Sequence, residues 1–528
     1  MSLTLADIIE CLETPKVWGN VEACVEDITY DSRKVGHNFI FVAIRGEKTD
    51  GHNFVHKASE SGASVIIAEE NPPTNFDIDK TSWVRVIDSR RALGPVADLI
   101  YGHPSRQMVL IGITGTNGKT TTTFLLESIL NEADFVPGII GTISHRWRGF
   151  ETPASNTTPE ASDIQKMLAD MKLAGVTHVL MEVSSHGLFL RRLDGCSFDL
   201  AIFTNLTHDH LDFHQNMASY FEAKRILFDE LLPVSSKSTT CSIINLDDLY
   251  GSRLAQETIG LPSITYGFNE LADIHPLSQE VSISGIRASI HTPNGVLSIK
   301  SELVGNFNLS NILSAVSASV ILQIPTEAVV RGVESLKTVP GRLQPIESNV
   351  GSLFVDYAHT PNALKNVLQA LRQISDGRLI TLMGCGGDRD RTKRQVMGSE
   401  AAVVSDFLVI TSDNPRTEDP LTIIEQIEIG VIESGFKKIL PDSKHSCIAA
   451  KTYVVIPDRR QAIQWIIKRL QPRDTLLLAG KGHETYQEIQ GVRYPFDDRS
   501  VALEIINGLK SGNPANTPSN AVTIELRA

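Results

Sequence analysis

The chain has 528 residues, 41% hydrophobic and 21% charged, an ordinary composition for a globular protein but too long for a single core, so we expect three domains. Its 49 basic and 62 acidic residues give a net charge of −13, which argues against nucleic-acid binding and against a polybasic membrane tether. No segment approaches the roughly 18 apolar residues of a membrane span, and the six cysteines form no C-x-x-C pair, so we expect a cytoplasmic protein with reduced thiols.

Short apolar segments that predict strands occur in the first hundred residues, at 39–44 and 63–68. Between them lies a polar segment, residues 46–54, that is rich in turn-forming residues. Residues 102–107, GHPSRQ, have the composition of a connector. We therefore expect an N-terminal domain over residues 1–103.

Apolar strands alternate with helical patterns in the next part of the chain, which predicts a parallel sheet. The strands are expected within residues 108–114, 177–183, 198–206 and 241–246. Residues 281–303 alternate with period two around Pro293-Asn294-Gly295, which predicts a hairpin. The segment TVPGRLQPI near residue 340 indicates a boundary, so the central domain is expected over residues 104–338.

The last part of the chain is the most regular. Four apolar strands are each followed directly by a polar loop, within residues 352–360, 379–391, 407–416 and 475–484. Between the first two lies a helical pattern with Leu364, Leu368 and Leu371 on one face. Because ligands bind outside the carboxyl ends of parallel strands, we expect the four loops to face one crevice. This domain is predicted over residues 339–510, and residues 511–528 are predicted to be a flexible tail.

A glycine-rich turn, GITGTNGKT at residues 112–120, joins a predicted strand to a predicted helix. Gly115 and Gly118 would let backbone N–H groups approach an anion at the helix N-terminus. Lys119 is expected to contact the β- and γ-phosphates of ATP, and Thr120 a magnesium ion. The pattern departs from G-x-x-x-x-G-K-[ST], because the first glycine stands one place early, at Gly112. A glycine-rich turn without a nucleotide is the alternative; we predict ATP binding and a P-loop-type central domain.

Histidines and acidic residues are concentrated in TNLTHDHLDFH, residues 204–214. His208, His210 and Asp212 match part of the H-x-H-x-D-H pattern of zinc hydrolases with the metallo-β-lactamase fold. The final histidine of that pattern is replaced by Phe213, and a zinc hydrolase would leave the glycine-rich turn unexplained. A di-zinc site is therefore an alternative and not the prediction.

Eleven segments resemble, in order, the motifs of the Mur ligases, which are ATP-dependent amide-bond-forming enzymes of peptidoglycan precursor synthesis. They cover roughly residues 28–500 and read TGTNGKTT, NTTPE, EVSSH, TNLTHDHLDFH, FEAK, GNFNLSN, PGRLQ, VDYAHTPNAL, GCGGDRDR, DNPR and GKGHE. The combination is most similar to members that add the third peptide residue to UDP-N-acetylmuramoyl-L-alanyl-D-glutamate. It implies an α/β fold of three domains, the central one of P-loop type and the C-terminal one Rossmann-like.

The resemblance implies that ATP phosphorylates the terminal carboxylate of the substrate and that an incoming amine displaces phosphate. Catalytic residues would be Lys119, Glu182, His210 and Lys224, and two Mg²⁺ ions would be held by Thr120, Glu182, His210 and Lys224 as a carbamate. ATP would contact Gly115, Thr116, Asn117, Gly118, Lys119, Thr120, Thr121, Asn308, Asn311, Arg342 and Asp356. From residue spacing alone, Lys224 reads as a helix lysine over apolar neighbours, and Glu182 as a carboxylate at the end of a strand.

The resemblance also assigns residues to the other substrates. UDP-N-acetylmuramoyl-dipeptide would contact Ser32, Arg33, Thr157, Thr158, Ser184 and Arg192. The incoming amino acid would contact Arg389, Asp413, Asn414, Pro415, Arg416, Gly480 and Glu484. One departure is Leu190, which stands where a glutamine is often found.

Arg416 in SDNPRTEDP is expected to select the amino acid. A planar guanidinium binds a carboxylate through two hydrogen bonds, and meso-diaminopimelate carries a carboxylate at its far end. Lysine ends in a bare ammonium, which Arg416 would repel. Glu484 is expected to pair with the distal ammonium of diaminopimelate.

Three alternatives remain open. One is another ligase of the superfamily, either a lysine-adding one, against which Arg416 argues, or a folylpolyglutamate synthetase, which would not need the N-terminal domain. Another is the zinc hydrolase. The third is a non-catalytic interaction protein like some plastid relatives, which would have no physical need to keep Lys119, Glu182, His210, Lys224 and Arg416. Small-molecule substrates and a monomer are expected.

Overall fold

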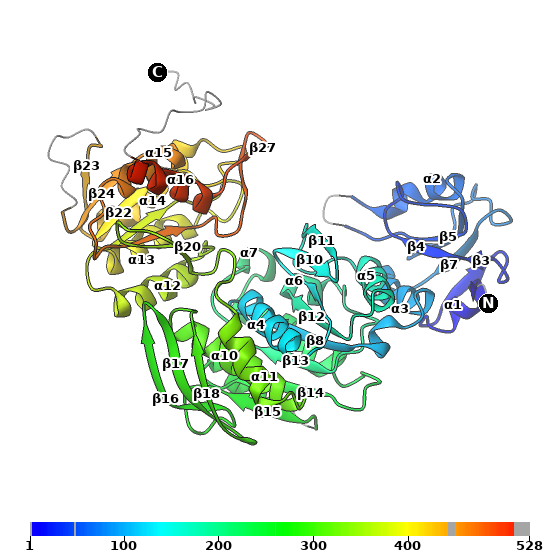
Figure 1. Ribbon diagram of the computed structural model, residues 1–528. Coiled ribbons are helices and arrows are strands. Elements are labelled where there is room, and N and C mark those ends of the chain that lie inside the picture. The colour runs from blue at the N-terminus through cyan, green and yellow to red at the C-terminus, as the bar shows by residue number, and fades with distance from the viewer. Residues whose placement is uncertain (1–2, 47–48, 259, 442–448, 512–528) are drawn as a thin grey trace. The chain divides into compact units, whose positions relative to one another are not determined.

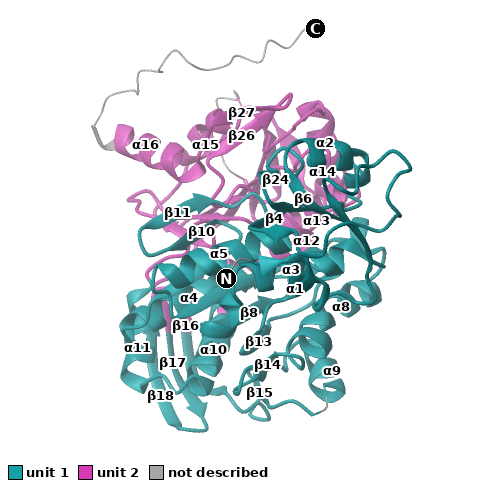
Figure 2. Ribbon diagram, turned by 90° about the vertical axis from the view of Figure 1, so that its right-hand side faces the viewer, with its two compact units in different colours: residues 1–280, 287–301, 308–336 teal, residues 281–286, 302–307, 337–528 magenta. Residues whose placement is uncertain are grey.

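The computed structural model describes residues 3–46, 49–258, 260–441 and 449–511. They group into two compact units (Figure 2). Unit 1 comprises residues 1–280, 287–301 and 308–336, and unit 2 comprises residues 281–286, 302–307 and 337–528. The predicted flexible tail lies outside the described residues, except Ser511 at the end of the last helix.

A five-stranded sheet in the order β2-β7-β6-β5-β4 forms the N-terminal part of unit 1 (Figure 1). Its strands and the short strands beside it are β1 Leu3–Thr4, β2 Lys16–Trp18, β3 Cys24–Val25, β4 Asp27–Thr29, β5 Phe39–Val42, β6 Ala63–Ala68 and β7 Ser82–Arg85. The helices are α1 Leu5–Ile9, η1 Gly51–Phe54, α2 Val55–Glu60, α3 Ser89–Ile100 and η2 Pro104–Gln107. The predicted strands near 39–44 and 63–68 are confirmed.

The central part of unit 1 is built on an eight-stranded sheet in the order β11-β10-β9-β12-β8-β13-β14-β15, parallel from β9 to β15. Its strands are β8 Val109–Thr114, β9 Pro137–Ile140, β10 Ser144–Trp147, β11 Phe150–Pro153, β12 His178–Val183, β13 Leu200–Phe203, β14 Cys241–Asn245 and β15 Ser263–Tyr266. Because β12, β8 and β13 are adjacent and parallel, the loops after them open at one edge of the sheet.

Helices follow these strands, as the alternating pattern predicts. They are α4 Lys119–Glu132, α5 Ala161–Leu173, α6 Ser185–Phe189, α7 Leu211–His214, α8 Met217–Ile226, the π-helix η3 Leu227–Leu231, α9 Leu249–Glu257, α10 Asn306–Ile321 and α11 Thr326–Ser335. A separate three-stranded sheet contains β16 His275–Ser282, β17 Gly285–Thr292 and β18 Gly295–Ser301. The predicted hairpin around residues 293–295 is the turn between β17 and β18.

Four consecutive threonines begin α4, although β-branched residues are weak helix formers. All four are buried, and three of their hydroxyls have hydrogen-bond partners. Thr120 donates to Glu182 Oε2 at 2.9 Å, Thr122 bonds Ser314 Oγ at 3.1 Å, and Thr123 donates to the Lys119 carbonyl at 3.0 Å. Buried hydroxyls are stable only when hydrogen-bonded, so tertiary contacts outweigh the weak local propensity here.

The C-terminal part of the chain forms a seven-stranded sheet in the order β19-β20-β25-β21-β22-β24-β23, in which only β19 is antiparallel to its neighbour. Its strands are β19 Gln344–Ile346, β20 Ser352–Asp356, β21 Leu379–Met383, β22 Phe407–Ile410, β23 Lys437–Ile439, β24 Thr452–Val455 and β25 Thr475–Ala479, and a hairpin follows with β26 Tyr486–Ile489 and β27 Val492–Pro495. The helices are α12 Pro361–Ile374, α13 Lys393–Val404, α14 Pro420–Glu433, α15 Arg459–Ile467 and α16 Asp498–Ser511.

The four strands predicted from the regular pattern, β20, β25, β21 and β22, are consecutive neighbours in this sheet. Their polar loops therefore leave the same edge, as expected. Leu364, Leu368 and Leu371 of α12 are all fully buried, which confirms the predicted apolar face.

Within unit 1, helix α3 of the N-terminal part lies directly against the central part. Tyr30 Oη donates to Asp163 Oδ2 at 3.0 Å, and Arg90 forms an ion pair with Glu160 at 3.7 Å. The backbone of α3 also approaches the loop after α6, since a Cβ atom on Gly94 would lie 1.9 Å from the Asp194 carbonyl oxygen. The two parts of unit 1 are therefore in backbone contact.

Substituting Gly94→Ala is expected to destabilise unit 1 by about 2–3 kcal/mol, because forced overlap with backbone outweighs the ~1 kcal/mol that alanine gains over glycine in a helix. Urea denaturation followed by circular dichroism measures the change. Arg91→Ala, at an exposed position of the same helix, is the control and should change stability by less than about 0.5 kcal/mol. Equal stability of Gly94→Ala and wild type would show that the backbone around Asp194 accommodates the added Cβ atom without loss of stability.

Candidate active site

The glycine-rich turn joins β8 to α4 with no room for larger residues. Gly115 and Gly118 have φ of 146° and 90°, in the region that favours glycine. A Cβ atom on Gly115 would lie 1.8 Å from Thr204 Oγ1, and one on Gly118 would lie 2.4 Å from Asn311 Oδ1. The turn is thus held against the loop after β13 and against α10, with its backbone at the N-terminus of a 14-residue helix.

Asn205 holds this turn in place, and the sequence reasoning missed it. Its carbonyl accepts from the Thr116 N–H at 2.8 Å, and its Oδ1 accepts from the Asn117 N–H at 2.9 Å. On the other side, Thr116 Oγ1 accepts from the Thr207 N–H at 3.0 Å. Asn205 lies inside the motif TNLTHDHLDFH, in which the histidines and acidic residues give the stronger chemical signal.

Lys119 lies over the turn. Its Nζ donates to the carbonyls of Gly115 at 2.8 Å and Thr116 at 3.0 Å. These carbonyls hold the ammonium beside the backbone where the predicted phosphates would lie. The positive charge of Lys119 and the helix N-terminus would therefore both act on the phosphates.

Glu182, at the end of β12, is 1% exposed. Oε2 accepts from Thr120 Oγ1 at 2.9 Å and from Thr142 Oγ1 at 2.8 Å, while Oε1 accepts from the Thr142 N–H at 3.1 Å. The structure therefore brings two predicted metal-binding residues, Thr120 and Glu182, into direct contact. A carboxylate and hydroxyls at the end of a parallel strand suit Mg²⁺. No sequence motif pointed to Thr142.

Lys224 of α8 is 1% exposed, and its Nζ lies 3.5 Å from Thr114 Oγ1 at the end of β8. Burial, reinforced by the nearby Lys119 ammonium, lowers the pKa of Lys224 well below its ordinary value. As residue spacing predicts, Lys224 is a helix lysine. Its ammonium lies 4.8 Å from the centre of the Tyr220 ring.

His210 precedes α7, with its ring 4.9 Å from that of His186. Loss of solvent contact and the neighbouring cations, among them Lys119 and Lys224, lower the pKa of His210 to about 4, against an opposing contribution from Asp209. The side chain keeps 44% of its surface exposed. The ring is neutral near pH 7, the form that ligates metals.

The residues assigned to the muramoyl-dipeptide lie next to this centre. Thr158 Oγ1 donates to the Glu182 carbonyl at 2.9 Å and accepts from the Ser184 N–H at 2.9 Å. Arg192 donates to the Thr158 carbonyl at 2.9 Å and pairs with Glu160 at 2.8 Å. Thr157 bonds Thr142 through their hydroxyls at 3.1 Å.

Ser32 and Arg33 lie on the loop after β4, in the N-terminal part. Arg33 pairs with Asp31 at 2.8 Å, and its side chain is 80% exposed. Among the described residues, no hydrogen bond or ion pair joins Arg33 to the phosphate loop or to Arg192. Asn308 and Asn311, by contrast, are bonded to each other at 3.1 Å, and Asn311 borders Gly118.

In unit 2, Arg342 and Asp356 are close neighbours. The Arg342 guanidinium lies 5.0 Å from the centre of the Tyr357 ring, and Asp356 Oδ2 accepts from the Leu343 N–H at 2.6 Å. Burial raises the pKa of Asp356 to about 6, while Arg342 opposes the shift. Gly480 joins this group through its N–H, which donates to the Asp356 carbonyl at 3.0 Å.

Arg416 follows β22 in the D-N-P-R turn. Its Nη1 donates to the Gly387 carbonyl at 2.7 Å, its Nε lies 3.9 Å from Glu488 Oε2, and its side chain is 18% exposed. A Cβ atom on Gly386 would lie 2.9 Å from Arg416 Nη1 and 3.9 Å from Arg389 Cγ. The two predicted arginines therefore border the same glycine, on loops from β21 and β22.

Asn414 and Glu484 are in direct contact, since Asn414 Nδ2 donates to Glu484 Oε2 at 2.8 Å. Between them lies Lys481 of the GKGHE motif, a residue to which the sequence pattern assigned no role. Its ammonium contacts Asn414 Oδ1 and Glu484 Oε2, each at 3.2 Å, and lies 3.6 Å from Asp413 Oδ1.

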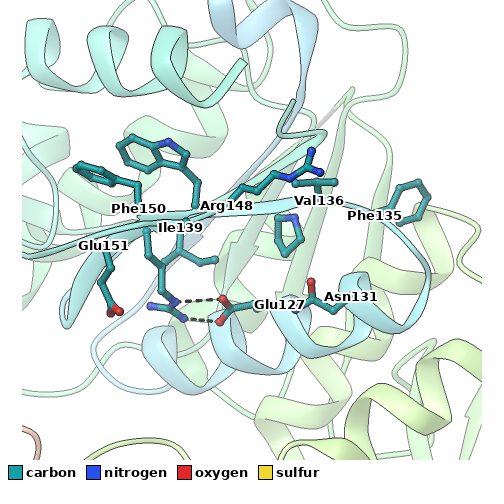
Figure 3. A pocket seen from close by; sticks show the side chains of 12 residues that line it. Glu127, Asn131, Phe135, Val136, Ile139, Arg148, Phe150 and Glu151 are labelled. Carbon is teal, nitrogen blue, oxygen red and sulfur yellow. Dashed lines mark hydrogen bonds and ion pairs between the residues drawn. The ribbon is translucent and has the colours of Figure 1, made fainter. Parts of the chain in front are cut away.

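A pocket of about 620 Å³ opens elsewhere in unit 1, between α4 and strands β9 to β11 (Figure 3). Trp147 and Phe150 stack at its rim with ring centroids 4.1 Å apart, and Arg146 pairs with Glu127. It contains none of the predicted site residues and lies along the C-terminal half of α4, away from the phosphate loop.

The zinc alternative would need several His or acidic side chains arranged around one metal ion. In the part of the chain that the structure describes, no group of three or more His, Cys, Asp or Glu side chains is arranged to hold a metal ion. Five of the six cysteines are described, and each is a free thiol: Cys11, Cys24, Cys196, Cys241 and Cys385. Every helix within the described ranges is too short or too polar to span a lipid bilayer.

Three protein-family models match the chain in order. Residues 25–101 match the Mur ligase family catalytic domain, residues 113–319 the Mur ligase middle domain, and residues 341–482 the Mur ligase glutamate ligase domain. The matches cover more than half of the chain.

Curated relatives match over nearly the full length. The UDP-N-acetylmuramoyl-L-alanyl-D-glutamate–2,6-diaminopimelate ligase of Geobacter metallireducens is 41% identical over 96% of this chain and 99% of its own, and that of Geobacter sulfurreducens is 40% identical over 97% and 100%. A solved structure with the same enzyme name has a TM-score of 0.68 and 31% identity, and covers 97% of this chain and all of its own.

Proposed function

This chain belongs to the Mur ligase family, and we propose that it is the ATP-dependent ligase that adds meso-diaminopimelate to UDP-N-acetylmuramoyl-L-alanyl-D-glutamate. The relatives that carry this name match from end to end at about 40% identity. The observation that carries the choice of amino acid is Arg416, whose guanidinium borders the loop from β21 and retains exposed surface.

The unit 1 site supports phosphoryl transfer to a carboxylate. Both reactants are anions, so the site must supply positive charge where they meet. Lys119 and the N-terminus of α4 supply it to the phosphates, and Arg192 lies near the expected position of the dipeptide. Thr120, Glu182, His210 and carbamylated Lys224 would hold two Mg²⁺ ions, which would supply further positive charge to the transferred phosphoryl group.

In the second half of the reaction, the amine of diaminopimelate attacks the acyl-phosphate carbonyl carbon; the new C–N bond forms, the C–O bond to phosphate breaks, and the amine loses a proton. The distal carboxylate would accept from Arg416, and the distal ammonium would lie by Asp413 and Glu484. A lysine side chain would place an ammonium beside Arg416 with no anion between them, which costs both repulsion and desolvation.

Other parts of the assignment remain proposals. The domains are proposed at residues 1–103, 104–338 and 339–510, with residues 511–528 as a tail, and Ser32 and Arg33 are proposed to contact the uridine diphosphate. Arg342, Asp356, Asn308 and Asn311 are proposed ATP contacts. We also propose a cytoplasmic monomer.

The test is phosphate release by the purified chain with ATP, Mg²⁺ and UDP-N-acetylmuramoyl-L-alanyl-D-glutamate, with diaminopimelate or L-lysine as the amine. Phosphate release should require ATP, Mg²⁺, the UDP substrate and the amine together. Its kcat/KM should be at least about 100-fold higher with diaminopimelate than with L-lysine. Equal use of lysine would favour the lysine-adding alternative, and release only with a folate and glutamate would favour the folylpolyglutamate alternative.

A carbamate on Lys224 is a further expectation. The family resemblance of FEAK and the burial of Lys224 support it, since the neutral amine that burial favours is the form that attacks CO₂, losing a proton as the N–C bond forms. Native mass spectrometry should find the carbamate mass in active protein prepared with bicarbonate. Lys224→Ala should be inactive and regain activity with added acetate, whereas acetate should not restore Lys119→Ala. Full activity of a preparation that contains only the free amine would contradict the expectation.

A further inference from the structure

Lys481 is the only lysine of the described residues whose side chain is fully buried in the C-terminal part of unit 2. It follows Gly480 at the carboxyl end of β25. A buried ammonium is costly unless it is paired and hydrogen-bonded. All the acceptors around it belong to residues proposed to bind the incoming amino acid: Asp413, Asn414 and Glu484.

The contacts of Lys481 fix the direction of the Asn414 amide. Asn414 Oδ1 accepts from Lys481 at 3.2 Å and from the Glu488 N–H at 3.0 Å, while its Nδ2 donates to Glu484 at 2.8 Å. A flipped amide would point its NH₂ group at the ammonium and at an N–H group. The Lys481 ammonium therefore helps to fix the orientation of the Asn414 side-chain amide within the amino-acid site.

The same ammonium fixes Glu484. One oxygen, Oε2, receives hydrogen bonds from both Lys481 and Asn414, so the rotamer of the carboxylate is set before any substrate binds. Burial raises the pKa of Glu484 and nearby Asp413 adds to the shift, whereas Lys481 opposes it. Lys481 thus favours the charged form of the Glu484 carboxylate.

Lys481, Asp413, Asn414 and Glu484 form a cluster whose formal charges do not sum to zero. Asp413 and Glu484 contribute two negative charges and Lys481 one positive charge, while the adjacent Arg459–Asp498 pair is fully buried and neutral as a pair. Asp413 Oδ1 is a buried oxygen that receives no hydrogen bond within the described residues, since Lys481 is 3.6 Å away. One further ammonium would neutralise the cluster and satisfy this oxygen.

We propose that Lys481 is the positioning residue for the amino-acid site: it orients Asn414 and Glu484 and leaves a deficit of one positive charge, which the distal ammonium of the incoming amino acid fills. This rests on the proposed function, because it takes diaminopimelate as the amino acid. Lys481 acts through its neighbours and needs no contact with the reacting atoms.

The experiment compares Lys481→Met, which keeps most of the side-chain volume but removes the charge, with wild type in steady-state phosphate release. The KM for diaminopimelate should rise roughly tenfold or more, while the KM for ATP and for the UDP substrate should stay within about twofold. Lys468→Met removes an exposed lysine of the same unit and should leave all three KM values unchanged.

A double variant tests whether Lys481 works through Glu484. In a Glu484→Gln background, Lys481→Met should raise the KM for diaminopimelate by much less than it does alone, because the carboxylate that it positions is already gone. If Lys481→Met does not fold, Lys481→Ala with added ethylammonium replaces it, and ethylammonium should lower the KM for diaminopimelate towards the wild-type value.

Several outcomes would overturn the proposal. They are an unchanged KM for diaminopimelate in Lys481→Met, fully multiplicative effects in the double variant, equal increases in all three KM values, or no effect of ethylammonium on folded Lys481→Ala. Failure of wild type to use diaminopimelate at all would instead refute the proposed function, so the two failures are distinguishable.

Discussion

Lys119→Met is expected to lower kcat for phosphate release by at least about a thousandfold, because the charge that neutralises the meeting anions is lost. In the structure this ammonium is held by the carbonyls of Gly115 and Thr116, directly over the phosphate loop. Methionine keeps the length of the chain but cannot donate to a phosphate oxygen. Steady-state phosphate release measures kcat, and calorimetry measures the remaining affinity for ATP.

The matched control for this variant is Lys172→Met, which removes an exposed lysine from the last turn of α5 in the same unit. Its kcat should equal that of wild type. A Lys119→Met protein that retains more than about a tenth of wild-type kcat would mean that the phosphate loop does not bind the transferred phosphate.

Arg416→Ala is expected to raise the KM for diaminopimelate about 100-fold, since a charge-assisted, two-bond contact with a carboxylate is worth roughly 3 kcal/mol. Affinity for ATP should not change. Selectivity should fall as well, because the variant no longer repels the ammonium of lysine: kcat/KM for lysine relative to diaminopimelate should rise. Competition between the two amino acids, with products separated by chromatography, measures this ratio.

Arg460→Ala is the control, because Arg460 is an arginine of the same unit that forms an exposed pair with Glu504 at 2.9 Å. It should leave both amino-acid KM values unchanged. An Arg416→Ala enzyme with wild-type kinetics for diaminopimelate would remove the guanidinium from the recognition of the distal carboxylate.

Much of the fold follows from local patterns in the sequence. Strand–helix alternation predicted the parallel sheets, and the order of β20, β25, β21 and β22 brings the four polar loops to one edge, as expected. Gly115 and Gly118 were also predictable, because only glycine tolerates their φ values and close neighbours.

Other features depend on residues that are distant in sequence. Thr142 bonds Glu182 from 40 positions away, and Lys481 meets Asn414 from 67 positions away. Contacts between residues so far apart in sequence produce no periodic pattern that could predict them. In addition, a lysine between two glycines is usually a solvated loop residue. The four threonines that begin α4 are likewise weak helix formers, and the sequence alone does not show that they become buried. Such contacts arise only when the chain folds.

The approach of Gly94 to the Asp194 carbonyl has a consequence for substrate length. It brings α3 and the loop after α6 together through backbone atoms, and Tyr30 is hydrogen-bonded to Asp163. The residues proposed for the nucleotide end and for the peptide end of the substrate would therefore lie on two parts of unit 1 that contact each other. A precursor with one amino acid too few or too many would place its carboxylate several ångströms from the phosphate loop. Unit 1 would then select precursors by the length of their peptide, independently of the selection of the incoming amino acid.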